Sequence, residues 1–333
     1  MKVGIFGTTA DSESRYLPYK EKYDKHLELI NLKCPPTYEN LDKIKEYGCE
    51  AIIYFNSKRE SHDYFEKMAK MGVRYLCTGS AGFDHFDLEV MKKYGIKGAN
   101  VPQYSPNAIS EHAVLLTLSV LRNFREQIKR IEKSEYGIDG LMGKEIRNQT
   151  IGIVGTGRIG STTAKCLSGF KPKKILAYSL GENPEIKDIV SYTDEETLFK
   201  ESDVIIFHCA ATSENYHMIN EETLKIMKDG VILINAARGS LFDNKAILNG
   251  VKSGKIGGLG IDVIEGEEKL KGTQTNIPCP IPELSELLKY PNVTFTRHTA
   301  FYTDEAFKNM TETTINNLLE YESTGSCVNE LVK

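Results

Sequence analysis

The chain has 333 residues, of which 40% are hydrophobic and 26% are charged, and its formal net charge is −4. This composition is typical of a folded protein with room for two domains, and it excludes a disordered chain. The acidic balance, without a block of lysines and arginines, argues against nucleic acid as a partner. No apolar run approaches the roughly 20 residues of a membrane span. The seven cysteines contain no CxxC pair, so we expect no metal site and free thiols in a reducing cytoplasm.

Short β-branched, apolar runs alternate with helical segments along the chain. This alternation predicts parallel sheets covered by helices, which is an α/β fold. One series of predicted strands precedes residue 100 and a second begins near residue 150, so we expect two sheets. The first series is Val3–Phe6, Ala51–Phe55 and Tyr75–Thr78; the second is Ile151–Val154, Ile175–Tyr178, Val204–His208, Val231–Asn235, Gly258–Val263 and Val293–Thr296.

A long helical segment that starts near Asn107 joins the two series, and a closing helix is predicted over Ala306–Tyr321. A helix that is apolar on most sides is buried, either inside its domain or in a subunit interface. For the joining helix we favour the interface, because each domain already has helices that cover its sheet. Its apolar residues are Ala113, Val114, Leu115, Leu116, Leu118, Val120 and Leu121.

Residues 151–160 read IGIVGTGRIG, a strand-like run that breaks into three glycines and continues as a helix. This spacing, between a strand and a helix, is a dinucleotide-binding fingerprint. Gly155 allows the tight turn, Gly157 lets the backbone approach a pyrophosphate, and Gly160 lets the helix pack against its strand. Amides at the start of the helix then bind the phosphates. The predicted cofactor-binding residues of this turn are Gly155, Gly157, Arg158, Ile159 and Gly160.

The end of the next strand bears on the type of cofactor. The fingerprint normally places an acidic residue there, which binds the ribose hydroxyls of NAD and repels the 2′-phosphate of NADP. Here the strand Ile175–Tyr178 is followed by Ser179, which can accept a hydrogen bond but does not repel a phosphate. No arginine at 180–183 would bind a 2′-phosphate, and Glu182 disfavours one. We expect NAD(H) as the cofactor, with use of NADP(H) as well.

Four further segments carry a family resemblance: NVPQYSPNAISEHAV at 100–114, LINAARGSLFD at 233–243, GLGIDVIEGE at 258–267 and TRHTAFYT at 296–303. With the fingerprint, they make the chain resemble the D-2-hydroxyacid dehydrogenase family, most of all its D-lactate and vancomycin-resistance D-lactate dehydrogenase branch. The resemblance implies two Rossmann-like domains with parallel sheets. A discontinuous substrate domain would cover 1–102 and 302–333, and an inserted NAD(P)-binding domain would cover 103–301. It also implies a homodimer that transfers a hydride between a nicotinamide cofactor and a 2-keto acid or D-2-hydroxy acid.

The same resemblance implies that Arg238, Glu267 and His298 are the catalytic residues. Reduction of a 2-keto acid requires a hydride on the carbonyl carbon, a proton for its oxygen and a group that fixes the carboxylate. His298 as imidazolium would donate the proton, and Glu267 would orient the ring and favour its protonated form. Arg238 would bind the carboxylate and polarise the keto oxygen, a task that suits its planar, forked guanidinium.

Substrate contacts are implied in the first domain. The family's carboxylate-binding loop falls on Ser80–Asp84, where the backbone at Ala81 and Gly82 would bind the substrate carboxylate. Tyr104 matches a family tyrosine that lies over the substrate, although it could instead be an aromatic residue that packs at a hinge.

The remaining cofactor contacts implied by the resemblance are Asp262, which would contact the nicotinamide carboxamide, and His208 and Arg158 along the cofactor cleft. The chain also departs from the family pattern, because Arg297 replaces the proline usual before the catalytic histidine. This cation could act on His298 or pair with Glu267.

Each catalytic assignment has a plain structural alternative. An isolated histidine after a strand is more often a satisfied surface or core residue, and an arginine there can simply cap a helix. Glu267 lies in an acidic run with Glu265, which could be a solvated face. The alternative function is that of a nucleotide-sensing corepressor on the same fold. The sequence defines neither which 2-keto acid is used nor the physiological direction of the reaction.

Overall fold

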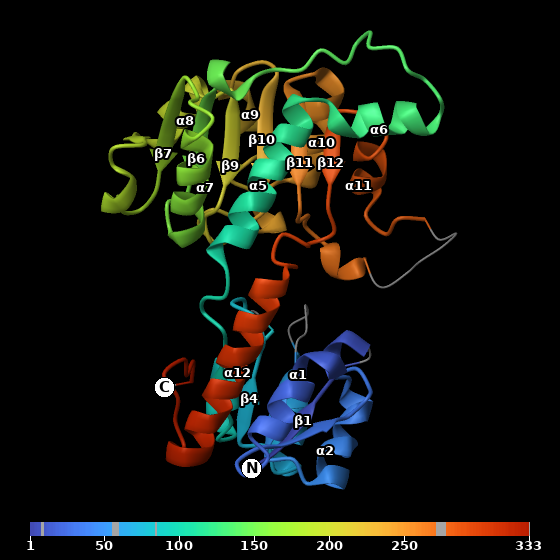
Figure 1. The fold of residues 1–333 in the computed structure, drawn as a ribbon, viewed down its shortest axis with the longest axis vertical. Helices are drawn as coiled ribbons and strands as arrows, with labels where there is room; N and C mark the ends of the chain where they lie inside the picture. The colour runs from blue at the N-terminus through green and yellow to red at the C-terminus, as the bar shows by residue number, and fades with distance from the viewer. Residues whose placement is uncertain (8–9, 55–59, 84, 271–277, 333) are drawn as a thin grey trace. The chain divides into compact units, whose positions relative to one another are not determined.

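The computed structural model describes residues 1–333 except 8–9, 55–59, 84, 271–277 and 333, and of residues 10–13 only the backbone. These residues form two compact units (Figure 1). Unit 1 consists of Met1–Ser105 and Thr303–Lys333, and unit 2 consists of Pro106–Tyr302. Each unit has its own parallel sheet, so the predicted α/β class with two parallel sheets is confirmed.

Unit 1 contains a five-stranded parallel sheet in the order β2-β1-β3-β4-β5. The sequence predicted β1, β3 and β4 but missed the two edge strands, β2 and β5. The strands are β1 (Lys2–Ile5), β2 (Glu28–Asn31), β3 (Ala51–Ile53), β4 (Tyr75–Cys77) and β5 (Lys97–Ala99). The helices are α1 (Ala10–Lys22), the 3-10 turn η1 (Tyr38–Leu41), α2 (Asp42–Tyr47), α3 (His62–Lys70), α4 (Leu88–Lys93) and α12 (Asp304–Thr324).

Two hydrophobic cores cover the two faces of this sheet. Tyr16 of α1 and Leu318 of α12 pack with Val3 of β1 in one core. Ile44 of α2 and Phe65 of α3 belong to the other core. The last helix of the chain therefore completes the core around the first strand, which explains why unit 1 is built from both ends of the sequence (Figure 1).

Unit 2 contains a seven-stranded parallel sheet in the order β12-β11-β10-β9-β6-β7-β8. The chain runs outward from β6 to β8 and resumes with β9 on the other side of β6, as in dinucleotide-binding folds. Every strand predicted here is present, and β8 is additional. The strands are β6 (Thr150–Val154), β7 (Lys174–Tyr178), β8 (Ser191–Tyr192), β9 (Val204–Phe207), β10 (Val231–Asn235), β11 (Ile256–Ile261) and β12 (Val293–Phe295).

Helices cover both faces of the unit 2 sheet. One core, under α5 and α7, takes Val204 and Ile206, whereas Ile205 between them belongs to the core under α8 to α11. This alternation follows from the two-residue period of a strand. The helices are α5 (Pro106–Leu121), α6 (Phe124–Glu132), α7 (Arg158–Ser168), α8 (Glu195–Glu201), α9 (Glu221–Ile226), α10 (Asn244–Ser253) and α11 (Pro282–Leu287), with 3-10 turns η2 (Ile146–Asn148), η3 (Pro184–Ile186), η4 (Gly239–Leu241) and η5 (Glu267–Lys269).

The buried face of α5 packs inside unit 2, against α7 and strands β10 and β11 (Figure 1). Leu116 is 1% exposed, while its neighbour Leu115 is 52% exposed. The buried apolar residues of this helix therefore cover the sheet of its own unit, and the predicted interface role of the helix stays a prediction for its outward side. Its other side, with Leu115, faces outward.

Among the described residues, no helix is both long and apolar enough to cross a membrane.

We predict that Leu116→Ala lowers the free energy of unfolding by about 2–5 kcal/mol, because it leaves a cavity between α5 and the sheet. Glu111→Ala, at an exposed position of the same helix, is the control, and it should change the free energy by less than about 0.5 kcal/mol. Denaturant unfolding of both variants measures the difference. Equal effects would contradict the packing of α5 within unit 2.

Candidate active site

The glycine-rich turn follows β6, at the point where the strand order of the unit 2 sheet reverses between β6 and β9. Ligands of open parallel sheets bind at such points. Gly155 has a φ of +91°, and a Cβ on Gly160 would lie 1.9 Å from the carbonyl oxygen of Gly155. Only glycine fits both positions without strain. Gly157 is the N-cap of α7, and a Cβ there would meet no atom within 4 Å, so space is open beside the amides of the first turn.

This turn fits the pyrophosphate of a dinucleotide. Arg158 and Ile159 begin α7, so their amides lie at the positive end of a helix of 11 residues. The cofactor residues predicted in the fingerprint therefore form one continuous turn and helix start. Their contact with the cofactor stays a prediction.

Ser179 lies directly after β7 and faces the glycine-rich turn. Its Oγ accepts a hydrogen bond from the amide of Thr156 at 3.3 Å. Thr156 is also bound through its side chain, because Tyr192 donates to its Oγ1 at 3.0 Å. Ser179 thus lies where the fingerprint places its ribose-binding carboxylate, and it carries no charge there.

His208 follows β9 and supports the glycine-rich turn. Its Nε2 forms a hydrogen bond with Thr163 Oγ1 of α7 at 2.9 Å, and its Nδ1 is buried without a hydrogen-bond partner in the described part of the chain. Burial lowers the pKa of His208 to about 4, so the ring is neutral near pH 7. Parts of the residue remain accessible. A buried polar atom without a partner fits a group that binds a ligand at this place.

Arg238 lies in the turn after β10. The buried Asn235 at the end of that strand shapes the turn, since its Nδ2 donates to the carbonyl oxygen of Arg238 at 2.9 Å and its Oδ1 accepts from the amide of Ala237 at 3.0 Å. The guanidinium of Arg238 is exposed and donates to the carbonyl oxygen of Ala237. Its remaining donors can bind a carboxylate.

Asp262 follows β11 and is fully buried. Its carboxylate accepts from Thr296 Oγ1 at 2.6 Å, from the amide of Thr299 at 2.8 Å and from the amide of Ala300 at 2.9 Å. Its backbone oxygen accepts from the amide of His298 at 2.8 Å. Asp262 therefore holds the turn over residues 296–300, and its contact with a nicotinamide stays a prediction.

The sequence assigned no role to His112 or Thr296, although both lie in the quoted motifs. The Thr296 hydroxyl gives its only hydrogen to Asp262, so the ring nitrogen Nε2 of His112, at 2.8 Å from Thr296 Oγ1, must be a donor. Burial raises the pKa of Asp262, but the hydrogen bonds that it accepts outweigh this, so the pKa lies below its ordinary value. The polar pattern of these motifs was visible in the sequence, but the contact was not.

The structure brings His298 and Glu267 together, with 2.8 Å between His298 Nδ1 and Glu267 Oε1. Because Glu267 engages Nδ1, the other nitrogen, Nε2, is the one available for proton transfer. His298 has a φ of +49°, and Gly266, with a φ of +83°, begins the turn that carries Glu267. The guanidinium of Arg297 donates to the backbone oxygens of Glu267 and Leu270. This cation therefore binds the main chain of the turn that carries Glu267.

In unit 1, the loop after β4 presents the backbone of Ala81 and Gly82. Asn100 Nδ2 donates to the carbonyl oxygen of Ala81 at 2.8 Å, and Ser80 Oγ donates to that of Gly82 at 2.7 Å. Both carbonyls thus have protein donors, which leaves the amides as the groups that could bind a carboxylate. Asp84 of the predicted loop lies outside the described residues.

Tyr104 lies at the end of the first stretch of unit 1. Asn309 of α12 donates to its carbonyl oxygen at 2.7 Å, which fixes its main chain. The residue is half-buried, and its predicted role over the substrate is not tested by this contact.

Comparisons with known proteins agree with the family suggested by the sequence motifs. Residues 114–300 match the family described as D-isomer specific 2-hydroxyacid dehydrogenase, NAD binding domain. The chain is 39% identical over 333 residues to an aromatic 2-oxoacid reductase of Clostridium sporogenes, covering 100% of this chain and 99% of the relative. It is 37% identical to the D-lactate dehydrogenase of Escherichia coli, covering 100% of both. A crystal structure of D-lactate dehydrogenase with NAD+ from Lactobacillus jensenii aligns with a TM-score of 0.85 at 28% identity, covering 100% of both chains.

Fold and site together define an NAD-binding oxidoreductase with Rossmann-like domains. The chain belongs to the D-isomer specific 2-hydroxyacid dehydrogenase family, which acts on the CH–OH group of D-2-hydroxy acids. The resemblance inferred from the motifs is therefore confirmed. The corepressor alternative finds no support in these relatives.

We predict that Asp262→Asn lowers the free energy of unfolding at pH 7 by about 2–4 kcal/mol, because an amide cannot replace a carboxylate that accepts several hydrogen bonds. The lowered pKa of Asp262 stabilises the wild type above the unfolded-state pKa, and this contribution is lost as the pH falls through the folded-state value. The difference between the two proteins should therefore shrink below about pH 4. Thermal unfolding between pH 7 and pH 3 measures it.

Asp229→Asn is the control for this experiment. Asp229 is exposed and pairs with Lys255 at 2.8 Å on the surface, so its loss should have no comparable effect. A constant difference between wild type and Asp262→Asn across the pH range would contradict the role given to the Asp262 carboxylate.

Proposed function

We propose that His298 is the acid–base residue of this dehydrogenase and that Glu267 holds it for that task. The observation that carries the proposal is the hydrogen bond of 2.8 Å between His298 Nδ1 and Glu267 Oε1. It fixes the ring orientation and leaves Nε2 as the nitrogen from which a proton can pass to the keto oxygen. In the oxidation direction, the neutral ring would remove the hydroxyl proton at the same nitrogen.

In this proposal, Arg238 binds and polarises the substrate. Its exposed guanidinium can bind the substrate carboxylate with two hydrogen bonds and polarise the keto oxygen. A nicotinamide cofactor supplies the hydride when it is bound. In unit 1, the amides of Ala81 and Gly82 provide further donors for the carboxylate, and Tyr104 contacts the substrate.

The proposed substrate is pyruvate or a bulkier 2-keto acid such as phenylpyruvate. The relatives support this range, because one is named for aromatic 2-oxoacids and another for D-lactate. We infer that the pocket walls come from the loops around Thr8–Asp11, Tyr54–Asn56 and Phe301–Tyr302, of which the first two lie partly outside the described residues. Turnover of a panel of 2-keto acids by the purified protein defines the preferred side chain.

We also propose that the enzyme uses NADPH as well as NADH. The support is the neutral Ser179 Oγ, which binds the amide of Thr156 at the place of the usual carboxylate. Contact of Gly155, Gly157, Gly160, Asp262 and His208 with the cofactor belongs to the same proposal.

A homodimer is proposed from the exposed apolar side chains between residues 115 and 142. A soluble monomer rarely exposes so many large apolar residues along one stretch of chain. They are Leu115, Phe124, Ile128, Ile131, Tyr136, Ile138 and Met142. A cytoplasmic location is proposed because all seven cysteines are free thiols.

We predict that His298→Ala lowers kcat for reduction by about two to four orders of magnitude and leaves binding of the reduced cofactor intact, because only proton donation is removed. Glu267→Gln should move the pH profile of reduction to lower pH, since an imidazolium without its carboxylate loses the proton more readily. Steady-state kinetics and a cofactor titration measure both effects. His298→Ala activity within tenfold of wild type would refute the assignment.

For the cofactor, we predict that Ser179→Asp lowers KM for NADH and raises it for NADPH. The new carboxylate would bind the ribose hydroxyls and repel the 2′-phosphate, which changes the preference by about 1–3 kcal/mol. Steady-state kinetics of both proteins with both cofactors provide the comparison. A wild-type enzyme with a strong preference for NADPH would show that a basic residue binds the 2′-phosphate and that this account of the pocket is wrong.

A further inference from the structure

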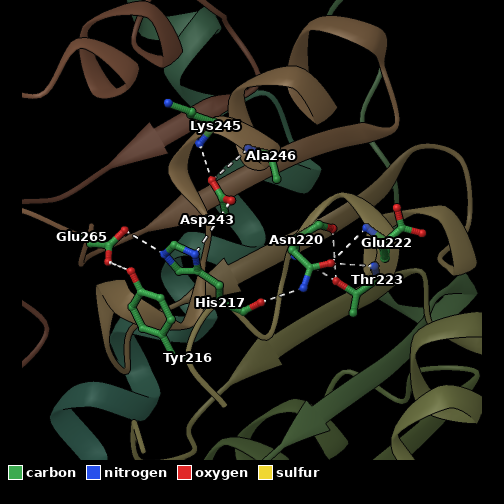
Figure 2. A network of polar contacts seen from close by, with 9 residues as sticks. All are labelled: Tyr216, His217, Asn220, Glu222, Thr223, Asp243, Lys245, Ala246 and Glu265. Carbon is green, nitrogen blue, oxygen red and sulfur yellow. Dashed lines mark hydrogen bonds and ion pairs between the residues drawn. The ribbon is translucent and has the colours of Figure 1, made fainter. Parts of the chain in front are cut away.

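A second histidine–glutamate pair involves Glu265, which lies two residues before the proposed catalytic Glu267 in the sequence. His217 Nε2 and Glu265 Oε2 are 2.9 Å apart, and His217 Nδ1 and Asp243 Oδ2 are 3.8 Å apart. Tyr216 donates to the other oxygen of Glu265 at 2.8 Å, and its ring stacks on His217 with 3.9 Å between centroids. Figure 2 shows the imidazole between the two carboxylates. We call Tyr216, His217, Asp243 and Glu265 the His217 clamp.

The clamp joins two segments that carry proposed catalytic residues. Asp243 follows Arg238 by five residues, and Glu265 precedes Glu267 by two. The main chain at His217 also binds the turn after β10, because the amide of His217 donates to the carbonyl oxygen of Ser240 at 2.9 Å. The imidazole therefore ties the turn after β10 to the turn after β11.

The same two turns touch through their backbones. A Cβ on Gly239 would lie 2.2 Å from the carbonyl carbon of Ile264 and 2.4 Å from the amide nitrogen of Glu265, so only glycine permits this approach. Asn244 Nδ2 donates to the carbonyl oxygen of Glu265 at 3.1 Å. A displacement of Glu265 would thus reach both the Arg238 turn and the Glu267 turn.

The position of His217 is specified by more than one contact. Its φ is +52°, a left-handed conformation that costs free energy for a residue with a side chain and is found where surrounding contacts require it. The hydrogen bond to Glu265 raises the pKa of Tyr216, so its hydroxyl stays protonated and donates. Without the imidazole, the carboxylates of Asp243 and Glu265 would face each other without a hydrogen-bond donor between them.

We propose that His217 and Glu265 are positioning residues, which hold the Glu267 turn so that Glu267 Oε1 meets His298 Nδ1 and keep the Arg238 turn in register with it. This inference rests on the proposed function of Glu267 and His298. The two glutamates of the acidic run thus have separate histidine partners, Glu267 with His298 and Glu265 with His217.

The test compares His217→Ala with wild type by kcat, KM for the keto acid and the pH profile of kcat/KM for reduction. We expect kcat to fall by about tenfold or more, because a small misplacement of catalytic groups is costly. The pH profile should move to lower pH, as in Glu267→Gln, and KM for NADH should stay within twofold. His217→Gln keeps a donor toward Glu265 and should restore most of kcat.

The matched control is His26→Ala. His26 also pairs with a carboxylate, Glu322, at 3.5 Å, but it is an exposed residue of unit 1 and serves no proposed catalytic segment. Its loss should leave kcat and the pH profile unchanged. Glu265→Ala should reproduce the effect of His217→Ala, and the double variant should be no slower than either single one.

Two outcomes separate the positioning role from the proposed function. If Glu267→Gln shifts the pH profile but His217→Ala does not, the positioning role is contradicted and the proposed function stands. If Glu267→Gln itself leaves the profile unchanged, both are contradicted. A drop in kcat of His217→Ala that comes with a lower thermal midpoint and an unshifted profile would indicate a merely structural residue and also overturn the inference.

Discussion

The buried carboxylate of Asp262 determines the geometry of the proposed proton-transfer site, because a charge in the interior must be matched by hydrogen-bond donors. Three of its donors come from the turn over residues 296–300, and His298 in the middle of that turn adopts a left-handed backbone. Strain of this kind costs on the order of 1–3 kcal/mol and persists only where neighbouring contacts fix the residue. The hydrogen bonds to Asp262 supply that constraint, and the ring of His298 then meets Glu267.

Sheet topology explains why these residues lie at one edge of unit 2. Parallel strands end at the same edge, and the chain places one of the proposed functional residues after each of five neighbouring strands. No local stretch of sequence could bring these residues together, because they are up to about 140 positions apart. They are Gly155 after β6, His208 after β9, Arg238 after β10, Asp262 after β11 and His298 after β12.

Much of this fold could be predicted from the sequence, and the missed parts have physical causes. The three missed strands, β2, β5 and β8, are all edge strands, which are not covered on both sides and lack a continuous apolar run. The sequence did not show that α5 covers the sheet of its own unit, because an apolar surface in the sequence does not reveal which partner covers it. The motifs gave Arg238, Glu267 and His298, but the links of His112 to Thr296 and of His217 to Glu265 join residues 184 and 48 positions apart, which no local pattern shows.

The central claim is that His298 and Glu267 act as one unit in proton transfer. A double-mutant cycle on kcat/KM for reduction, with His298→Ala, Glu267→Gln and the combination of both, tests it most directly. The account predicts that Glu267→Gln slows the wild-type enzyme but causes no further loss once His298 is absent. Additive losses in the double variant would contradict it, because they would show that Glu267 contributes to catalysis independently of His298.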